Sequence, residues 1–148
     1  MGIGKIAILG AGQMGNGIAQ VAASAGFSVL MIDIKQDYVD NGMLAIENSL
    51  ARMVKKDRMS IEDADQALAR ISTATKKEAA ADADLVIEAI PEIPELKFST
   101  FAQLDKICKP QAILASNTSS ISINDIAQAT NRPEKVIGMH FMNPVPVM

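Results

Sequence analysis

The sequence predicts an α/β fold with a doubly wound parallel sheet. Short apolar runs alternate along the chain with longer stretches of helical character, and this alternation is typical of parallel strands joined by helices. The runs DLVIEAI and AILAS are apolar almost throughout, as expected of strands covered by helices on both faces. A glycine-rich turn follows the first run directly, as in the strand-turn-helix units of such sheets.

The first unit comprises a strand, a turn and a helix. The apolar run from Ile3 to Leu9 predicts the strand, and a helix is expected from near Gln13 to Gly26. Between them Gly10 permits a sharp bend, and Gly15 lets the helix lie close to the sheet. This order predicts that the N-terminus of the helix lies at the carboxyl edge of the sheet.

The turn predicts a dinucleotide site. Its second glycine, Gly12, lets the backbone approach a pyrophosphate, and the helix points free N–H groups and its positive dipole end at the phosphates. Glycine-rich turns also recur for purely structural reasons, so the motif needs support from its context. The candidate pyrophosphate contacts are Gly10, Ala11, Gly12, Gln13, Met14 and Gly15.

Supporting context comes from the second apolar run, residues 27–32, which ends in Asp33. Asp33 lies about 20 residues after the turn, the distance expected for the acid that accepts the adenosine ribose hydroxyls. Its negative charge would repel the extra phosphate of NADP, so the sequence favours NAD. Lys35 is close enough to weaken this preference, and Asp33 is alternatively a cap for the next helix.

An unusually long crossover, residues 35–70, separates the second and third predicted strands. Its first part predicts one long amphipathic helix, because apolar residues recur with a 4-3-4-3 spacing at Val39, Met43, Ile46, Leu50 and Met53. Ser60 and Asp63 then resemble a capping box for a second, shorter helix. We expect a helical hairpin that projects from the sheet.

One side of this hairpin is cationic. Arg52 and Lys56 are four residues apart, and Lys55 and Arg58 are close by. The cluster is either a solvated charged face or a docking surface for a phosphorylated substrate.

The second half of the chain predicts four more strands and two helices. The strands are expected at Ile71–Thr75, Asp84–Ile90, Ala112–Ser116 and Val136–Phe141. The helices are expected at Pro94–Cys108 and Ile121–Ala129. In the first helix a broad apolar stripe would cover the sheet, comprising Leu96, Phe98, Phe101, Leu104 and Ile107.

Polar clusters follow the fifth and sixth predicted strands, SNTSS at residues 116–120 and MHFMNP at residues 139–144. Because ligands lie at the carboxyl edge of such sheets, we expect Ser119 and His140 to face one nicotinamide ring. His140, the only histidine, is suited to take the hydroxyl proton in an alcohol oxidation. Ser119 would hold the substrate oxygen or the nicotinamide amide. The alternatives are a hydrogen-bonded structural histidine and a serine in a loop or helix cap.

The composition excludes other classes of function. With 148 residues and 49% hydrophobic content, the chain fits one globular domain and is short for a two-substrate dehydrogenase. A net charge of −3 and 3% aromatic residues argue against nucleic-acid binding. We interpret Cys108, the single cysteine, as a small apolar residue at a helix end and not as a metal ligand. The first apolar run is too short to cross a membrane, so we expect a cytoplasmic protein.

Four segments resemble the L-3-hydroxyacyl-CoA dehydrogenases, particularly the bacterial 3-hydroxybutyryl-CoA dehydrogenases: GAGQMGNGIAQ, DLVIEAIPE, ASNTSS and GMHFMNPVPVM. The resemblance covers the whole chain. It implies a Rossmann-like fold and the NAD-dependent oxidation of (3S)-3-hydroxyacyl-CoA, such as 3-hydroxybutyryl-CoA, to 3-ketoacyl-CoA. It also implies that His140 is the acid–base residue, Ser119 contacts substrate and cofactor, and Asp33 is the ribose acid.

Further site residues follow from the same resemblance. It implies that Glu92, Lys97 and Asn143 contact the cofactor, and that Ser49 and Lys56 on the hairpin contact the coenzyme A moiety. Glu88 is left open, as a partly hydrated carboxylate at a strand end that is tolerated only with water or partners nearby.

Members of this family continue into a second, mainly helical domain, which carries the glutamate partner of the histidine, much of the acyl pocket and the usual homodimer surface. The sequence stops at Met148, so we expect residues 1–148 to be the NAD-binding domain and a poor catalyst alone. Two alternatives remain. One is a non-catalytic single-domain NAD-binding module, and the other is a dehydrogenase for small hydroxy acids or sugar acids.

Overall fold

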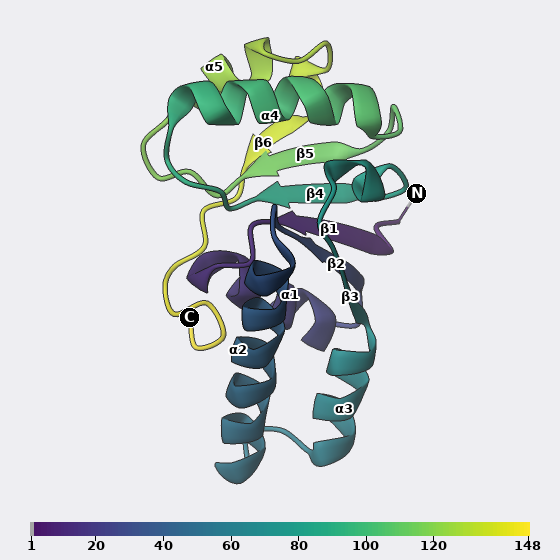
Figure 1. The fold of residues 1–148 in the computed structure, drawn as a ribbon, viewed down its shortest axis with the longest axis vertical. Helices are drawn as coiled ribbons and strands as arrows, with labels where there is room; N and C mark the ends of the chain where they lie inside the picture. Colours follow the sequence, from purple (N-terminus) through teal and green to yellow (C-terminus); the bar gives the residue numbers. More distant parts are fainter. Residues whose placement is uncertain (1) are drawn as a thin grey trace.

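The structure is a computed structural model that describes residues 2–148, and across these residues it has one six-stranded parallel sheet (Figure 1). The strands are β1 (Lys5–Leu9), β2 (Ser28–Ile32), β3 (Ile71–Ala74), β4 (Leu85–Glu88), β5 (Ile113–Ser116) and β6 (Val136–Gly138). Their order is β3-β2-β1-β4-β5-β6, and every neighbouring pair is parallel. The predicted Rossmann-like fold is confirmed. The winding reverses between β1 and β4, where ligands bind in sheets of this type.

Helices cover both faces of the sheet. They are α1 (Gln13–Ser24), α2 (Gln36–Lys55), α3 (Ile61–Ala69), α4 (Pro94–Ile107) and α5 (Ile123–Gln128), with 3₁₀ turns η1 (Lys77–Ala80) and η2 (Pro133–Lys135). Alternate strand residues point to opposite faces. In β1, Ile6 and Ile8 therefore pack with α1, α2 and α3, whereas Ala7 and Leu9 pack with α4 and α5.

The turn after β1 requires glycine at two positions. Gly10 has a φ of 105°, and a Cβ there would lie 2.4 Å from the carbonyl oxygen of Ala89. A Cβ on Gly15 would lie 1.8 Å from the carbonyl oxygen of Gly10. The sharp bend and the close approach of α1 are thus both as predicted from the sequence.

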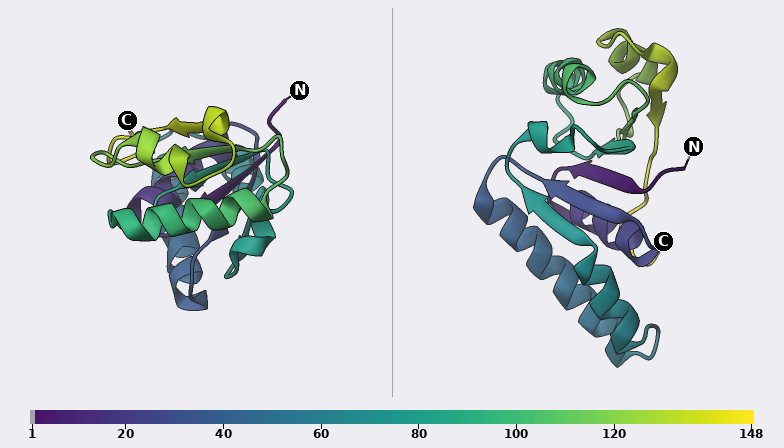
Figure 2. Two further views of the ribbon diagram at one scale, coloured as in Figure 1. Left: turned by 90° about the horizontal axis from the view of Figure 1, so that it is seen from above. Right: turned by 90° about the vertical axis from the view of Figure 1, so that its right-hand side faces the viewer.

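The hairpin between β2 and β3 is also confirmed. Figures 1 and 2 show α2 and α3 side by side, extending away from the sheet. At 1.5 Å per residue, the 20 residues of α2 span about 30 Å. Ile46 and Leu50 of α2 belong to the same buried cluster as Ala64 and Ala67 of α3. Ser60 caps α3 as expected, since its hydroxyl accepts a hydrogen bond from the Asp63 N–H at 3.1 Å.

The structure corrects two details near the carboxyl edge of the sheet. β6 ends at Gly138 instead of Phe141, because the Phe141 N–H donates to the side-chain oxygen of Asn117 at 2.8 Å and the chain leaves the sheet. In α4, Leu96 is 40% exposed and does not join the predicted stripe. The start of this helix extends past the carboxyl ends of β4 and β5 (Figure 1), and its buried residues are Lys97, Thr100, Phe101 and Leu104.

Within residues 2–148, no helix combines the length and the apolar character needed to cross a membrane.

Candidate functional site

A crevice lies where the winding of the sheet reverses, between the carboxyl ends of β1 and β4. This switch-point crevice has a volume of about 710 Å³. Gly10, Gly12 and Asp33 line one side, and Ile90 and Leu96 line the other. The structure thus brings the glycine turn and the predicted ribose acid, which are far apart in sequence, to one opening.

Gly12 differs from the other two glycines of the motif. A Cβ on Gly12 would meet no atom within 4 Å, so the packing of the described protein does not require glycine there. Gly12 is the N-cap of α1, and the first turn of this helix contains no acidic residue. The open space and the free N–H groups fit a pyrophosphate held by the backbone.

Asp33 is fixed by two backbone groups. Its carboxylate accepts hydrogen bonds from the Ala11 N–H at 2.9 Å and the Ile34 N–H at 2.7 Å. The alternative role as a helix cap is wrong, because α2 begins at Gln36 after the N-cap Lys35 and has no side-chain cap. The Lys35 ammonium lies over the ring of Tyr38, 5.6 Å from its centre.

A second opening, the strand-end cavity, has a volume of about 390 Å³ and shares Met14, Ala89, Ile90 and Pro91 with the switch-point crevice. It unites the remaining predicted cofactor and catalytic residues from four segments of the chain. These lining residues are Glu92, Lys97, Ser119, His140 and Asn143.

Ser119 and His140 lie in exposed loops at the strand-end cavity. Next to His140, the Met139 N–H donates to the Ser116 carbonyl at 2.8 Å, and the imidazole itself is exposed. Ser119 is exposed in the loop after β5. It does not cap a helix, because α5 begins at Ile123 and Ser122 is its cap. Both side chains are therefore accessible from the cavity.

Glu92 is the most highly bonded carboxylate of the cavity wall. It pairs with the Lys97 ammonium at 2.8 Å and accepts hydrogen bonds from the Thr118 and Ser120 hydroxyls, each at 2.9 Å, and from the Ser119 N–H at 3.3 Å. Partial burial raises the pKa of Glu92, but hydrogen bonds from Lys97, Thr118 and Ser120 outweigh this effect and lower the pKa to about 2. Glu92 is therefore an anion that orders the loop after β5.

The expectation of a partly hydrated Glu88 is wrong, since Glu88 is fully buried. Its carboxylate is satisfied by protein groups: the Lys97 ammonium at 2.6 Å, the Ile90 N–H at 2.8 Å and the Ser116 hydroxyl. These partners compensate for the loss of hydration.

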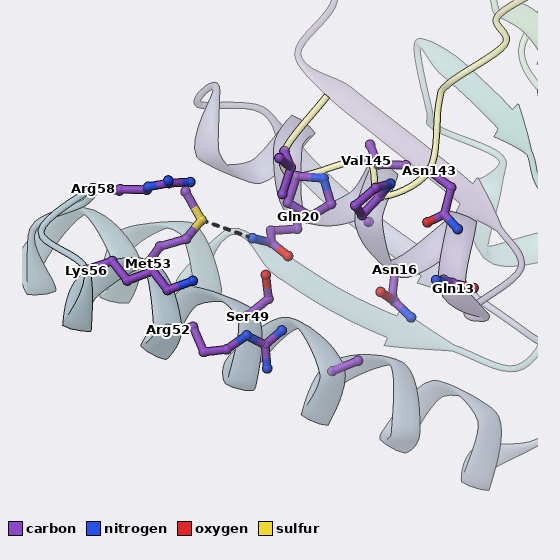
Figure 3. Close-up of a pocket in the computed structure, with 15 residues that line it drawn as sticks. Gln13, Asn16, Gln20, Ser49, Arg52, Met53, Lys56, Arg58, Asn143 and Val145 are labelled. Atoms are coloured by element: carbon purple, nitrogen blue, oxygen red, sulfur yellow. Dashed lines mark hydrogen bonds between the residues drawn. The ribbon is translucent and has the colours of Figure 1, made fainter.

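A third opening, the hairpin cavity, lies between α1, α2 and residues 143–147 and has a volume of about 260 Å³. Figure 3 shows Ser49 and Arg52 of α2 and the adjoining Lys56 on one side, with Asn16 and Gln20 of α1 opposite. Ser49, Arg52 and Lys56 are spaced by three and four residues, so they share a helix face. No acidic residue lines this cavity among the described residues. Three of the four cationic residues predicted on this side of the hairpin, Arg52, Lys56 and Arg58, thus line a cavity.

A family model for the NAD binding domain of 3-hydroxyacyl-CoA dehydrogenases matches residues 5–148. The chain belongs to this family. Residues 5–148 are accordingly an NAD-binding domain of the 3-hydroxyacyl-CoA dehydrogenase family, and the resemblance inferred from the sequence is confirmed.

Individual relatives agree with this assignment. The 3-hydroxybutyryl-CoA dehydrogenase of Bradyrhizobium diazoefficiens is 52% identical over 146 residues, which are 99% of this chain and 50% of that protein. The crystal structure of (S)-3-hydroxybutyryl-CoA dehydrogenase from Ralstonia eutropha superposes with a TM-score of 0.97 at 46% identity, covering 99% of this chain and 52% of that one. The chain spans about half the length of the curated relatives it matches.

Several polar residues at the site of this 3-hydroxyacyl-CoA dehydrogenase domain were not predicted from the sequence. Thr118 and Ser120 bind Glu92, Asn117 binds the His140 loop, and the buried Gln20 lines the hairpin cavity. The run SNTSS contained the signal for the first three, but it did not show which hydroxyl bonds to which carboxylate. Gln20 stands out only as a polar residue within the apolar face of α1.

Proposed function

We propose that the protein containing this domain oxidises (3S)-3-hydroxyacyl-CoA, with 3-hydroxybutyryl-CoA as the preferred class, to 3-ketoacyl-CoA. The observation that carries this proposal is the position of the strand-end cavity. It adjoins the switch-point crevice through Met14 and the hairpin cavity through Asn143. A cofactor entering from one side and a phosphorylated substrate entering from the other would meet beside His140 and Ser119.

NAD, when bound, supplies the acceptor for the hydride that leaves the substrate carbon. On the protein side, Gly10, Gly12, Gly15 and the N-terminus of α1 would hold the pyrophosphate, with Asp33 at the adenosine ribose. Both oxygens of the acidic Asp33 side chain accept hydrogen bonds from backbone N–H groups, which hold its charge in place. We propose that this charge selects NAD over NADP.

His140 would take the hydroxyl proton of the substrate as a general base. Ser119 would donate its hydroxyl hydrogen to the reacting oxygen or to the nicotinamide amide. Glu92, Lys97 and Asn143 line the same cavity and would contact the nicotinamide half of the cofactor. These roles require side chains in fixed positions. The hydrogen bonds that Glu92 accepts from the loop after β5 fix that loop.

The hairpin cavity would receive the coenzyme A moiety. Ser49 and Lys56 are the predicted contacts, and Arg52 adds positive charge on the same helix face. Phosphate oxygens are strong acceptors for such side chains. In the whole protein we propose that a second, mainly helical domain provides a glutamate partner for His140 and a homodimer surface.

The test is the oxidation of NADH by the whole protein with acetoacetyl-CoA as substrate. We expect His140→Ala to reduce kcat by at least about a hundredfold, because general acid–base catalysis contributes roughly 10²–10⁴ in rate. Ser119→Ala should also slow turnover, whereas Ser122→Ala, which removes the serine that caps α5, should not. An unchanged rate for His140→Ala would show that the assigned base is wrong.

A further inference from the structure

Glu88 and Lys97 are charged side chains with almost no exposure, at 0% and 1%. Glu88 is the last residue of β4, and Lys97 lies near the start of α4. The Lys97 ammonium is 2.6 Å from a Glu88 oxygen and 2.8 Å from a Glu92 oxygen. The Glu92 side chain is 41% exposed. Lys97 therefore connects a carboxylate inside the protein with one at the cavity wall.

A second chain of hydrogen bonds connects the same two carboxylates. The Ser116 hydroxyl donates to Glu88 and accepts from the Thr118 N–H at 3.1 Å. The Thr118 hydroxyl donates to Glu92 at 2.9 Å. Together with Lys97 these contacts close a ring, which ties the loop after β4 to the loop after β5.

The direction of the Ser116 hydrogen bond depends on Glu88 being a carboxylate. An ionised carboxylate only accepts hydrogen bonds, so the single proton of the Ser116 hydroxyl points to Glu88 and its oxygen is left for the Thr118 N–H. The Lys97 ammonium is shared between two anions. Without the charge of Glu88, the ammonium would move toward Glu92 and compete with the Thr118 and Ser120 hydroxyls for its oxygens.

We propose that Glu88 is a positioning residue of the cofactor site, which acts through Lys97 to hold Glu92 and Ser119 at the wall of the strand-end cavity. This inference rests on the proposed function, because it assumes that NAD occupies that cavity. Glu88 itself lies behind the wall and does not line any of the three cavities.

The first test is the affinity of residues 1–148 for NADH, followed by fluorescence, for the wild type and for Glu88→Gln. Glutamine has the shape of glutamate but lacks the charge and presents an N–H₂ group. We expect about tenfold weaker binding, the loss that corresponds to one displaced hydrogen bond to a charged group. The matched control is Asp105→Asn on the same helix, which removes the carboxylate that pairs with Arg132 at 2.6 Å. This control should keep the wild-type affinity.

The second test separates action through Lys97 from a general effect on folding. Lys97→Met alone leaves a buried carboxylate without its cation, whereas Glu88→Gln with Lys97→Met removes both charges. We expect the double variant to bind NADH as weakly as Lys97→Met, and to melt at a higher temperature than Lys97→Met. If Glu88→Gln alone does not fold, the comparison of the double variant with Lys97→Met still tests whether Glu88 acts through Lys97.

The outcomes distinguish the two proposals. Absence of NADH binding by the folded wild type would overturn the proposed function and the inference with it. Wild-type affinity of Glu88→Gln would overturn the inference alone. The inference is also wrong if Glu88→Gln weakens binding by the same factor with and without Lys97, because Glu88 would then act by another route.

Discussion

At the residue scale, the glycine motif contains positions with opposite physical demands. Gly15 faces the backbone of Gly10 at a distance that excludes a Cβ, whereas Gly12 faces open space. One glycine is needed for the fold, and the other leaves room beside the crevice. Substitution by alanine therefore separates folding from binding.

We predict that Gly15→Ala lowers the free energy of unfolding by about 3 kcal/mol, because a backbone contact must open to admit the methyl group. Gly12→Ala should cost only about 1 kcal/mol, because alanine is a poorer N-cap than glycine but its methyl group would meet no atom within 4 Å. It should nevertheless weaken NADH binding by at least about tenfold, because its methyl group would occupy space meant for the pyrophosphate. Thermal melts and NADH titrations measure both effects. Equal affinities of Gly12→Ala and the wild type would contradict this role for the turn.

Glu92 predicts how stability depends on pH. Its pKa is about 2 in the folded protein and about 4.5 as the ordinary value, so the folded state favours the ionised form. Its contribution is fully present above about pH 4.5 and is lost as the pH falls toward 2. Between pH 5 and pH 2.5, the melting temperature of Glu92→Gln should therefore fall less than that of the wild type. Glu134→Gln, an exposed glutamate outside the cavities, controls for the loss of a carboxylate. Parallel curves for Glu92→Gln and the wild type would argue against this contribution.

At the scale of elements, the pattern of apolar residues predicted much of the fold. The 4-3-4-3 spacing predicted α2, and the continuous apolar runs predicted β4 and β5. Burial of one helix face, or of both faces of a strand, requires apolar residues at positions that can be identified in the sequence. The 3₁₀ turns η1 and η2 leave no such trace, since each is only three or four residues long.

The site was less predictable than the fold. A charged residue is expected at the surface, so nothing in the sequence marks Glu88 and Lys97 as a buried pair. Their pairing arises because α4 starts above the end of β4, and that position depends on the packing of the whole sheet. The exposure of Leu96 has the same cause.

The hairpin supports a prediction about the substrate side. Arg52 and Lys56 line the hairpin cavity, whereas the adjacent Lys55 does not. In the whole protein, Arg52→Ala and Lys56→Ala should each raise KM for acetoacetyl-CoA by about fivefold to tenfold, since each removes a charge-assisted contact to phosphate. Lys55→Ala loses the same charge without a cavity contact and should stay close to the wild type. Equal effects of the three substitutions on KM would indicate a long-range electrostatic attraction and not a docking site.

At the scale of the whole molecule, the three cavities adjoin one another through shared lining residues. The switch-point crevice begins at Asp33, the strand-end cavity contains His140, and the hairpin cavity ends near Lys56. Gln13 and Asn143 each line two of these openings. The dinucleotide and the substrate would therefore approach the same histidine from opposite sides.

We propose that residues 1–148 bind NAD across the switch point of the sheet, and calorimetry with this chain tests this proposal most directly. We predict one site for NADH, and weaker binding of NADPH because Asp33 opposes the extra phosphate. The Asp33→Ala variant should bind NADH less tightly, and its affinities for NADH and NADPH should differ less than those of the wild type. A correctly folded chain that releases no heat with NADH, or that binds NADPH more tightly, would contradict the account.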